Sequence, residues 1–186
     1  MAAGNENLTK LLNTILNSFI DLCRCDAGSI YTLRRDAEKQ PVLVFEAMST
    51  RSMKLFQVPD SLKNMRFKLD ETTLVGKTAV TRAFHRAKFD VEAATGRPGA
   101  FTGYVTRNIL SAPLLSPRGD LVGVVQLLNK LPYDRDPGAT PGPKDDPSTY
   151  PEFDTRDERL LSIVAGQAAL AIENSLLLEE QEHLLE

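Results

Sequence analysis

The sequence predicts an α+β domain in which helices from both ends of the chain cover one face of an antiparallel sheet. A short helix and a threonine-rich loop from mid-chain are expected on the other face. Three observations support this class: helical patterns at both ends, strand-like segments with tight turns between them, and one short helical pattern among the strands. A length of 186 residues suits one such domain with helical extensions.

The first part of the chain contains one helix and two strands. Apolar residues recur at spacings of three and four over residues 8–20, as on one face of a helix. Residues 29–33 and 42–47 favour strands, and the residues between them form a polar turn. We therefore expect an N-terminal helix over residues 1–24, which packs on the core or forms a dimer contact. The main domain is expected to follow over residues 25–178.

The middle of the chain alternates short elements with loops. Residues 66–69 alternate in polarity and predict a short strand, and residues 72–84 show helical periodicity after an acidic start. Residues 88–91 predict a further brief strand. The polar, glycine-containing residues 93–106 are expected to form a loop with one short helical turn.

A hairpin and an irregular insertion follow. Residues 108–115 and 121–128 are strand-like, and Pro117-Arg-Gly-Asp120 supplies a tight turn between them. Residues 131–152 hold six prolines and two glycines, which prevent a regular element. We expect this stretch to be a flexible surface insertion.

A long final helix is expected from Thr155 to the end of the chain. Thr155 and Glu158 have the spacing of a capping box, in which a hydroxyl and a carboxylate bind free amides at a helix start. The broad apolar face that follows is expected to pack on the sheet. Residues 179–186 then begin a linker helix, the onset of a coiled coil toward an output domain.

Charge and composition argue against several classes of partner. A formal charge of −3 disfavours nucleic acid, whose phosphates attract basic surfaces. No apolar run approaches the roughly 20 residues that span a bilayer, and no signal peptide is apparent, so we expect a cytoplasmic protein without a membrane contact. Cys23 and Cys25 are interpreted as reduced thiols, too few for a disulfide framework. The one local basic cluster is interpreted as a solvated helix face and comprises Arg82, His85, Arg86 and Lys88.

Five residues and one segment carry a family resemblance. The residues are Asn129-Lys130, then Phe153, and after three further residues Asp157-Glu158; the segment upstream is Thr102-Gly-Tyr-Val-Thr106-Arg-Asn-Ile-Leu110. Together they resemble the N-K…F-x-x-x-D-E signature and pocket segment of GAF domains, in the subset that binds cyclic nucleotides in phosphodiesterases and adenylate cyclases. The resemblance spans about residues 5–178. It implies the GAF sheet-and-helix arrangement around a ligand pocket, and a regulatory module rather than an enzyme.

The signature residues have a structural interpretation. An ion pair between Lys130 and Asp157 would tie the end of the hairpin to the start of the final helix across the insertion. Asn129 could bind backbone amides that lack another partner, and Phe153 could fill the gap between the hairpin and the final helix. A plainer alternative is that Asp157 and Glu158 only suit the positive end of a helix. The resemblance favours the ion pair that ties the hairpin to the final helix. It implies that the five signature residues have a supporting, structural role near the pocket.

Two threonines are candidate contacts for a phosphate. Thr102 and Thr106 are four residues apart, so on a short helical turn both hydroxyls would lie on one face. Free amides at such a helix start would attract the single negative charge of a cyclic phosphodiester.

The resemblance places further residues at the pocket. Ser29, Phe45 and Glu46 match positions around the base of the nucleotide, and Leu74 and Val75 match a backbone segment near its phosphate. The alternatives are that Phe45 belongs to the core and that Leu74 and Val75 only pack a helix.

Two more positions are implied by the resemblance. Gln126 matches a pocket-lining site, and Asp90 matches an aspartate at a strand end that would help to order the loop. Gln126 also interrupts an apolar strand, where a buried amide without a partner costs roughly 1–3 kcal/mol. Ligand, water or backbone is therefore expected to meet its side chain.

The resulting functional hypothesis is a sensory GAF domain that binds cyclic AMP or cyclic GMP without a cofactor or metal. It would relay the signal through its terminal helices to an output domain such as a cyclase, phosphodiesterase or kinase. A parallel homodimer through the first and last helices is expected. The alternatives are a ligand-free module for dimerisation and signal relay, and a methionine sulfoxide reductase that would depend on Cys23 and Cys25.

Overall fold

The computed structural model describes residues 2–89, 104–132 and 150–186. Asp90 and Thr102 lie outside these ranges, as do most of the expected loop at 93–106 and most of the expected insertion at 131–152. The other candidate site residues are all within them.

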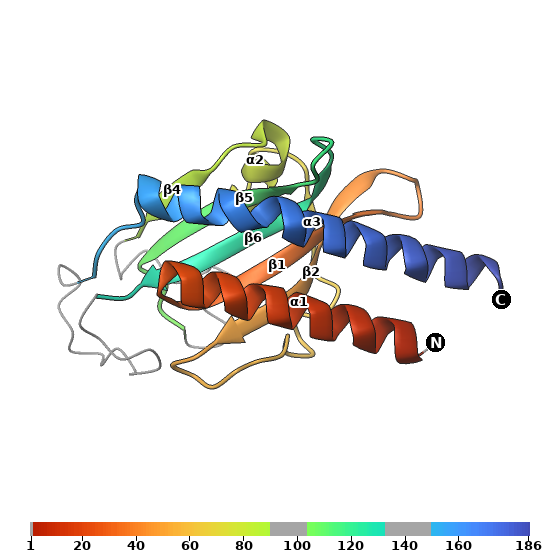
Figure 1. Ribbon diagram of the computed structural model, residues 1–186, viewed down its shortest axis with the longest axis horizontal. Coiled ribbons are helices and arrows are strands. Elements are labelled where there is room, and N and C mark those ends of the chain that lie inside the picture. Colours follow the sequence, from red (N-terminus) through yellow and green to blue (C-terminus); the bar gives the residue numbers. More distant parts are fainter. Residues whose placement is uncertain (1, 90–103, 133–149) are drawn as a thin grey trace.

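The described residues form three helices and six strands in the predicted order (Figure 1). Figure 1 also shows that both ends of the chain lie at the same end of the molecule. The elements are α1 (Ala2–Cys23), β1 (Cys25–Arg35), β2 (Pro41–Thr50), β3 (Arg66–Lys68), α2 (Leu74–Thr81), β4 (His85–Lys88), β5 (Asn108–Leu115), β6 (Leu121–Lys130) and α3 (Thr155–Leu184).

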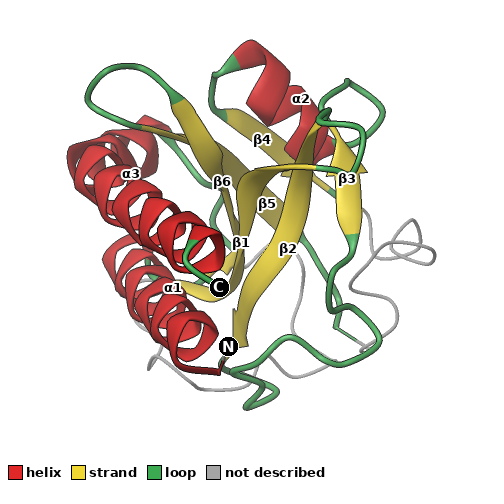
Figure 2. Cartoon of the chain, turned by 90° about the vertical axis from the view of Figure 1, so that its right-hand side faces the viewer, coloured by secondary structure: helices red, strands yellow, loops and turns green. Residues whose placement is uncertain are grey.

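The strands make one antiparallel sheet in the order β3-β2-β1-β6-β5-β4. Figure 2 shows α1 and α3 side by side against one face of this sheet and α2 against the other. The central strands β1 and β6 are therefore covered on both faces, which explains why most of their residues are buried. The predicted α+β class and its layers are confirmed.

Two apolar clusters lie on the two sides of the sheet. Ile30 and Leu127 face the helices and pack with Phe19 of α1 and Leu161 and Ile172 of α3. The neighbouring residues in sequence face the other way, because successive side chains of a strand alternate. On that side Tyr31, Phe45 and Val124 pack with Val75 and Ala79 of α2.

Helix α2 is shorter than the predicted 72–84. Thr73 precedes it in an extended conformation, and its hydroxyl accepts the Gly76 N–H at 3.1 Å. The helix ends at Arg82, which adopts the left-handed conformation with φ 53°.

The basic cluster is consequently not a helix face, and that interpretation was wrong. The early end of α2 lets strand β4 begin at His85, three residues before the predicted start at residue 88. Arg86 donates to the Phe153 carbonyl at 2.9 Å and pairs with Glu158 at 3.3 Å. These contacts join the edge strand to the start of α3.

The capping box of α3 also differs from the prediction by one residue. Asp154, not Thr155, is the N-cap, and its carboxylate accepts the Asp157 N–H at 3.1 Å. The Asp157 carboxylate in turn accepts the Asp154 N–H at 2.9 Å. Asp157 thus belongs to both the cap and the family signature.

Within the described residues, α3 is the one helix that is long and apolar enough to cross a membrane by length and composition. This corrects the expectation that no apolar run suffices. Core helices of soluble proteins meet the same criterion, so packing must be considered as well. Leu161, Ala169 and Ile172 of α3 are buried against the sheet and α1, which accounts for the apolar character of one side of the helix.

We predict that Gly76→Ala lowers the free energy of unfolding. A Cβ at this position would lie 2.3 Å from the Asp70 carbonyl oxygen and 2.5 Å from that of Lys68. These are backbone atoms, so the expected loss is that of overpacking, roughly 1–3 kcal/mol in thermal or urea unfolding. Gly166→Ala in α3 is the matched control, because a Cβ there meets nothing within 4 Å. It should raise stability by up to about 1 kcal/mol; equal effects of the two changes would contradict the steric argument.

Candidate functional site

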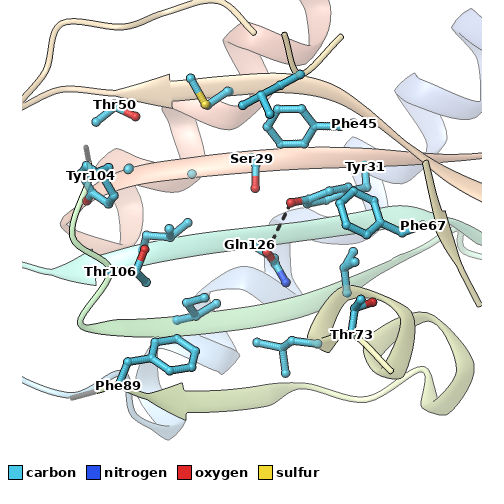
Figure 3. Close-up of a pocket in the computed structure, with 18 of the residues that line it drawn as sticks. Ser29, Tyr31, Phe45, Thr50, Phe67, Thr73, Phe89, Tyr104, Thr106 and Gln126 are labelled. Carbon is cyan, nitrogen blue, oxygen red and sulfur yellow. Dashed lines mark hydrogen bonds between the residues drawn. The ribbon is translucent and has the colours of Figure 1, made fainter. Parts of the chain in front are cut away.

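A cavity of about 510 Å³ lies between the sheet and α2, on the face opposite α1 and α3 (Figure 3). Its volume is in the range of pockets that hold small organic ligands. Its walls come from β1, β2, β6, the start of α2 and the segment before β5.

One side of the cavity is aromatic. The ring centroids of Tyr31 and Phe45 are 5.1 Å apart, and those of Tyr31 and Phe67 are 5.4 Å apart in an edge-to-face pair. Figure 3 shows the three rings together at one end, with Thr50, Tyr104 and Thr106 at the other. Among the described residues that line the cavity, none is charged. Any charge on a ligand would therefore be met there by hydroxyls and backbone amides.

Ser29, Phe45 and Gln126 all line the cavity, whereas Glu46 does not. Glu46 is the extra residue at a β-bulge, because Ile30 pairs with Ala47 and Tyr31 pairs with Phe45. On the helix side of the sheet its carboxylate accepts from Thr32 Oγ1 at 2.8 Å and pairs with Arg34 at 2.8 Å. These contacts correct the expectation that Glu46 surrounds a base.

Gln126 is held by other side chains on the cavity floor. Its Nε2 donates to Ser111 Oγ at 3.3 Å, and its Oε1 accepts from the Tyr31 hydroxyl at 3.5 Å. Burial raises the pKa of Tyr31 to about 12, so this hydroxyl remains a donor at neutral pH. The prediction that Gln126 needs a polar partner is satisfied, but by side chains rather than by ligand, water or backbone.

The start of α2 forms part of the cavity wall. Thr73, Leu74 and Val75 are all lining residues. The Thr73 hydroxyl binds the Gly76 N–H, and the Thr73 carbonyl accepts from Lys77 N at 2.9 Å. The first two amides of the helix, those of Leu74 and Val75, have no intrahelical acceptor. They are the amides that an anion could use.

Thr106 lines the cavity and is buried, but the segment around it is not helical. The predicted helical turn is therefore absent from the described part of this segment, residues 104–107. Asn129 fixes the segment instead. Its Oδ1 accepts from Arg107 N at 2.7 Å, and its Nδ2 donates to Val105 O at 2.8 Å. Asn129 thus binds backbone amides, as the sequence suggested.

Half-buried Tyr104 and buried Asp26 form a pair that sequence analysis missed. The Tyr104 hydroxyl donates to Asp26 Oδ2 at 2.8 Å and accepts from Asn129 Nδ2 at 3.0 Å. Burial, followed by the nearby Asp26 carboxylate, holds the pKa of Tyr104 well above its usual value. The available signal was a carboxylate shortly before a predicted strand, because a carboxylate that becomes buried needs a partner.

The signature residues join β6 to α3. Lys130 Nζ donates to Asp157 Oδ2 at 2.5 Å and lies 3.6 Å from Asp154 Oδ2. The Asp157 side chain is only 5% exposed. Phe153 is buried in the helix-side cluster, the apolar cluster between the sheet and helices α1 and α3. Glu158 pairs with Arg86.

The cysteines lie away from the cavity. Cys23 and Cys25 are both buried in the helix-side cluster. Burial, aided by the Asp157 carboxylate, raises the pKa of Cys23 to about 12, and burial likewise raises that of Cys25. A nucleophilic cysteine needs the opposite shift. A search of the described residues found no group of three or more His, Cys, Asp or Glu side chains arranged to hold a metal ion.

Comparison with known proteins identifies the family. The family model described as "GAF domain" matches residues 7–172. The chain belongs to the GAF family. The matched range includes β1 to β6 and most of α1 and α3, so it covers the whole cavity.

Solved structures share this fold at low sequence identity. The GAF-B domain of DevS from Mycobacterium smegmatis is 15% identical, with a TM-score of 0.56 over 95% of this chain and 98% of that chain. A GAF domain from a Coxiella burnetii phosphoenolpyruvate-protein phosphotransferase is 15% identical, with a TM-score of 0.63 over 93% and 86%. A type II free methionine-R-sulfoxide reductase from Thermoplasma acidophilum is 14% identical, with a TM-score of 0.56 over 92% and 95%. No curated protein matches the sequence significantly.

We predict that Lys130→Ala destabilises this GAF domain by about 3 kcal/mol, because it leaves the buried Asp157 carboxylate without its cation. Urea unfolding measures the loss. Lys63→Ala is the matched control, since it removes an ion pair to Asp60 that is exposed on both sides. The control should change stability by less than about 1 kcal/mol. Equal losses would mean that the Lys130 pair contributes no more than a surface contact.

Proposed function

We propose that this GAF domain is a cytoplasmic sensory module that binds cyclic AMP or cyclic GMP in the cavity. Occupancy would be relayed through α1 and α3 to an output domain such as a cyclase, phosphodiesterase or kinase. The observation that carries the proposal is the cavity itself, which combines an aromatic side with hydroxyls and free helix-start amides and has no charged side chain among its described lining residues. The proposal needs no cofactor or metal, and assigns the domain no catalytic residue.

The wall chemistry suits a planar base joined to a single negative charge. The Tyr31, Phe45 and Phe67 rings offer an apolar slot for a purine. The Leu74 and Val75 amides and the Thr106 hydroxyl are neutral donors for a phosphodiester. Asp90 and Thr102 lie outside the described residues, and their proposed contacts rest on the resemblance alone.

A route from the cavity to α3 runs through β2. Phe45 faces the cavity, and its neighbour Glu46 faces the helices. Arg34 of β1 lies 2.8 Å from Glu46 and 3.4 Å from Glu179 near the end of α3. A ligand that moves Phe45 therefore also moves a carboxylate that shares its arginine with the output helix.

A parallel homodimer is part of the proposal, and α3 supplies its support. Ile163, Leu170, Leu177 and Leu184 are spaced seven residues apart and are 73%, 44%, 51% and 82% exposed. A heptad stripe of apolar residues is the pattern of a coiled-coil seam. This exposure leaves the stripe accessible to a second copy, on a helix that Figure 2 shows beside α1.

Titration calorimetry with cyclic AMP and cyclic GMP tests the proposal, and Thr106→Ala tests the site. Loss of one hydrogen bond to a charged group should weaken binding roughly tenfold or more. Thr14→Ala on the exposed side of α1 is the matched control and should bind as the wild type does. Binding of neither nucleotide would instead favour the ligand-free relay module. The reductase hypothesis would require activity that disappears on replacing both buried cysteines by serine.

We predict that Arg34→Ala uncouples the cavity from the end of α3. Hydrogen exchange of residues 176–184 should rise in the free protein, and the ligand-induced change in that exchange should shrink. Stability should fall by less than about 1 kcal/mol, because the arginine is half-buried. Arg35→Ala is the control, since among the described residues the side-chain hydrogen bond of Arg35 stays within its own turn, at the Lys39 carbonyl. If the ligand-induced change in exchange were the same in Arg34→Ala as in the wild type, the proposed route from the cavity to α3 through Arg34 would be contradicted.

A further inference from the structure

A chain of polar side chains runs from Gln126, which lines the cavity, to the start of α2. Gln126 contacts Ser111 at 3.3 Å, and Ser111 Oγ lies 2.7 Å from Thr78 Oγ1. Thr78 Oγ1 lies 2.8 Å from the Leu74 carbonyl oxygen, at the start of α2. Thr78 and Ser111 are fully buried, so these bonds are shielded from competing water.

The direction of each hydrogen bond in this chain follows from its last member. A carbonyl oxygen can only accept, so the Thr78 hydroxyl donates to Leu74. Its oxygen then accepts the Ser111 proton, and the Ser111 oxygen accepts from Gln126 Nε2. The opposite direction would require Thr78 to donate to Ser111 and would lose its bond to Leu74. The complete set of bonds therefore orients the Gln126 amide with its nitrogen toward Ser111.

The opposite end of the amide is left as an acceptor. Gln126 Oε1 receives the Tyr31 hydroxyl at 3.5 Å, a long contact that leaves most of its accepting capacity unused. The hydroxyl protons of Tyr31, Ser111 and Thr78 are thus engaged within the protein. A lone pair of Gln126 Oε1 remains for a ligand, and Gln126 lines the cavity (Figure 3).

We infer that the side-chain oxygen of Gln126 accepts a hydrogen bond from an exocyclic amine of the bound base. Ser111 and Thr78 are positioning residues that hold this oxygen toward the amine. This inference rests on the proposed function and names the feature of the ligand that the cavity selects. The 6-amino group of adenine and the 2-amino group of guanine both meet the requirement. A base without an amine leaves Gln126 Oε1 with only its long contact to Tyr31.

Two ligand pairs that each differ by one amino group test the inference by titration calorimetry. Cyclic AMP is compared with the cyclic monophosphate of purine riboside, and cyclic GMP with cyclic IMP. In whichever pair binds, we expect the deaminated partner to bind roughly tenfold more weakly. Equal affinities within the pair would overturn the inference and leave the proposed function standing. If no member of either pair binds, both are overturned.

Ser111→Ala tests whether the affinity ratio depends on the orientation of the Gln126 amide. Without the Ser111 oxygen the Gln126 amide is free to turn, so the affinity ratio within the bound pair should fall toward one. The ratio is a readout that a general loss of stability does not move. Ser162→Ala on the exposed surface of α3 is the matched control and should keep the wild-type ratio. Retention of the ratio in Ser111→Ala would show that Gln126 is not oriented through this chain, and would overturn the inferred role of Ser111.

Discussion

The side chain of Asn129 is the contact on which both the cavity and the position of α3 depend. It is 3% exposed and makes four hydrogen bonds, which is the full capacity of an asparagine amide. Two are donated and two accepted, so a carboxylate of the same size could not replace it. The partners span one short segment of the cavity wall: Tyr104, Val105, Arg107 and Asn108.

Asn129 also determines the direction that the chain takes after β6. It adopts the left-handed conformation with φ 58°, which asparagine tolerates better than most residues. Lys130 follows, and its amide donates to Asn108 Oδ1 while its ammonium group reaches Asp157. The wall of the cavity and the first turn of α3 are therefore held by two consecutive residues.

Local patterns predicted the elements well, because a helical stripe, a strand and a Pro-Arg-Gly-Asp turn are properties of neighbouring residues. The predicted bounds of β5 agree with the observed ones, and so does the predicted start of α3 at Thr155. Local patterns failed where the outcome depends on residues far apart in sequence. Tyr104 and Asp26 are 78 positions apart, and neither shows locally that the other is its partner. The signature indicated the Lys130 contact because a family pattern carries long-range information that periodicity lacks.

The misplacement of Glu46 has a different origin. A family match gives a position along β2 but not the face of the sheet, and the β-bulge at Glu46 interrupts the alternation of faces there. The same limit applies to Thr106, whose spacing from Thr102 suggested a helical turn that the described part of the segment does not adopt. Gln126 was correctly marked as a residue that needs a partner, because the argument rested on the cost of desolvation rather than on a neighbour.

The uncharged lining has a consequence for how a ligand would respond to its surroundings. Mobile ions weaken attraction between opposite charges over about 8–10 Å at physiological ionic strength. The described lining residues carry no formal charge, so an anion held by their hydroxyls and amides loses little to such screening. Occupancy of the cavity would then track the ligand concentration in the cell and stay nearly indifferent to its salt content.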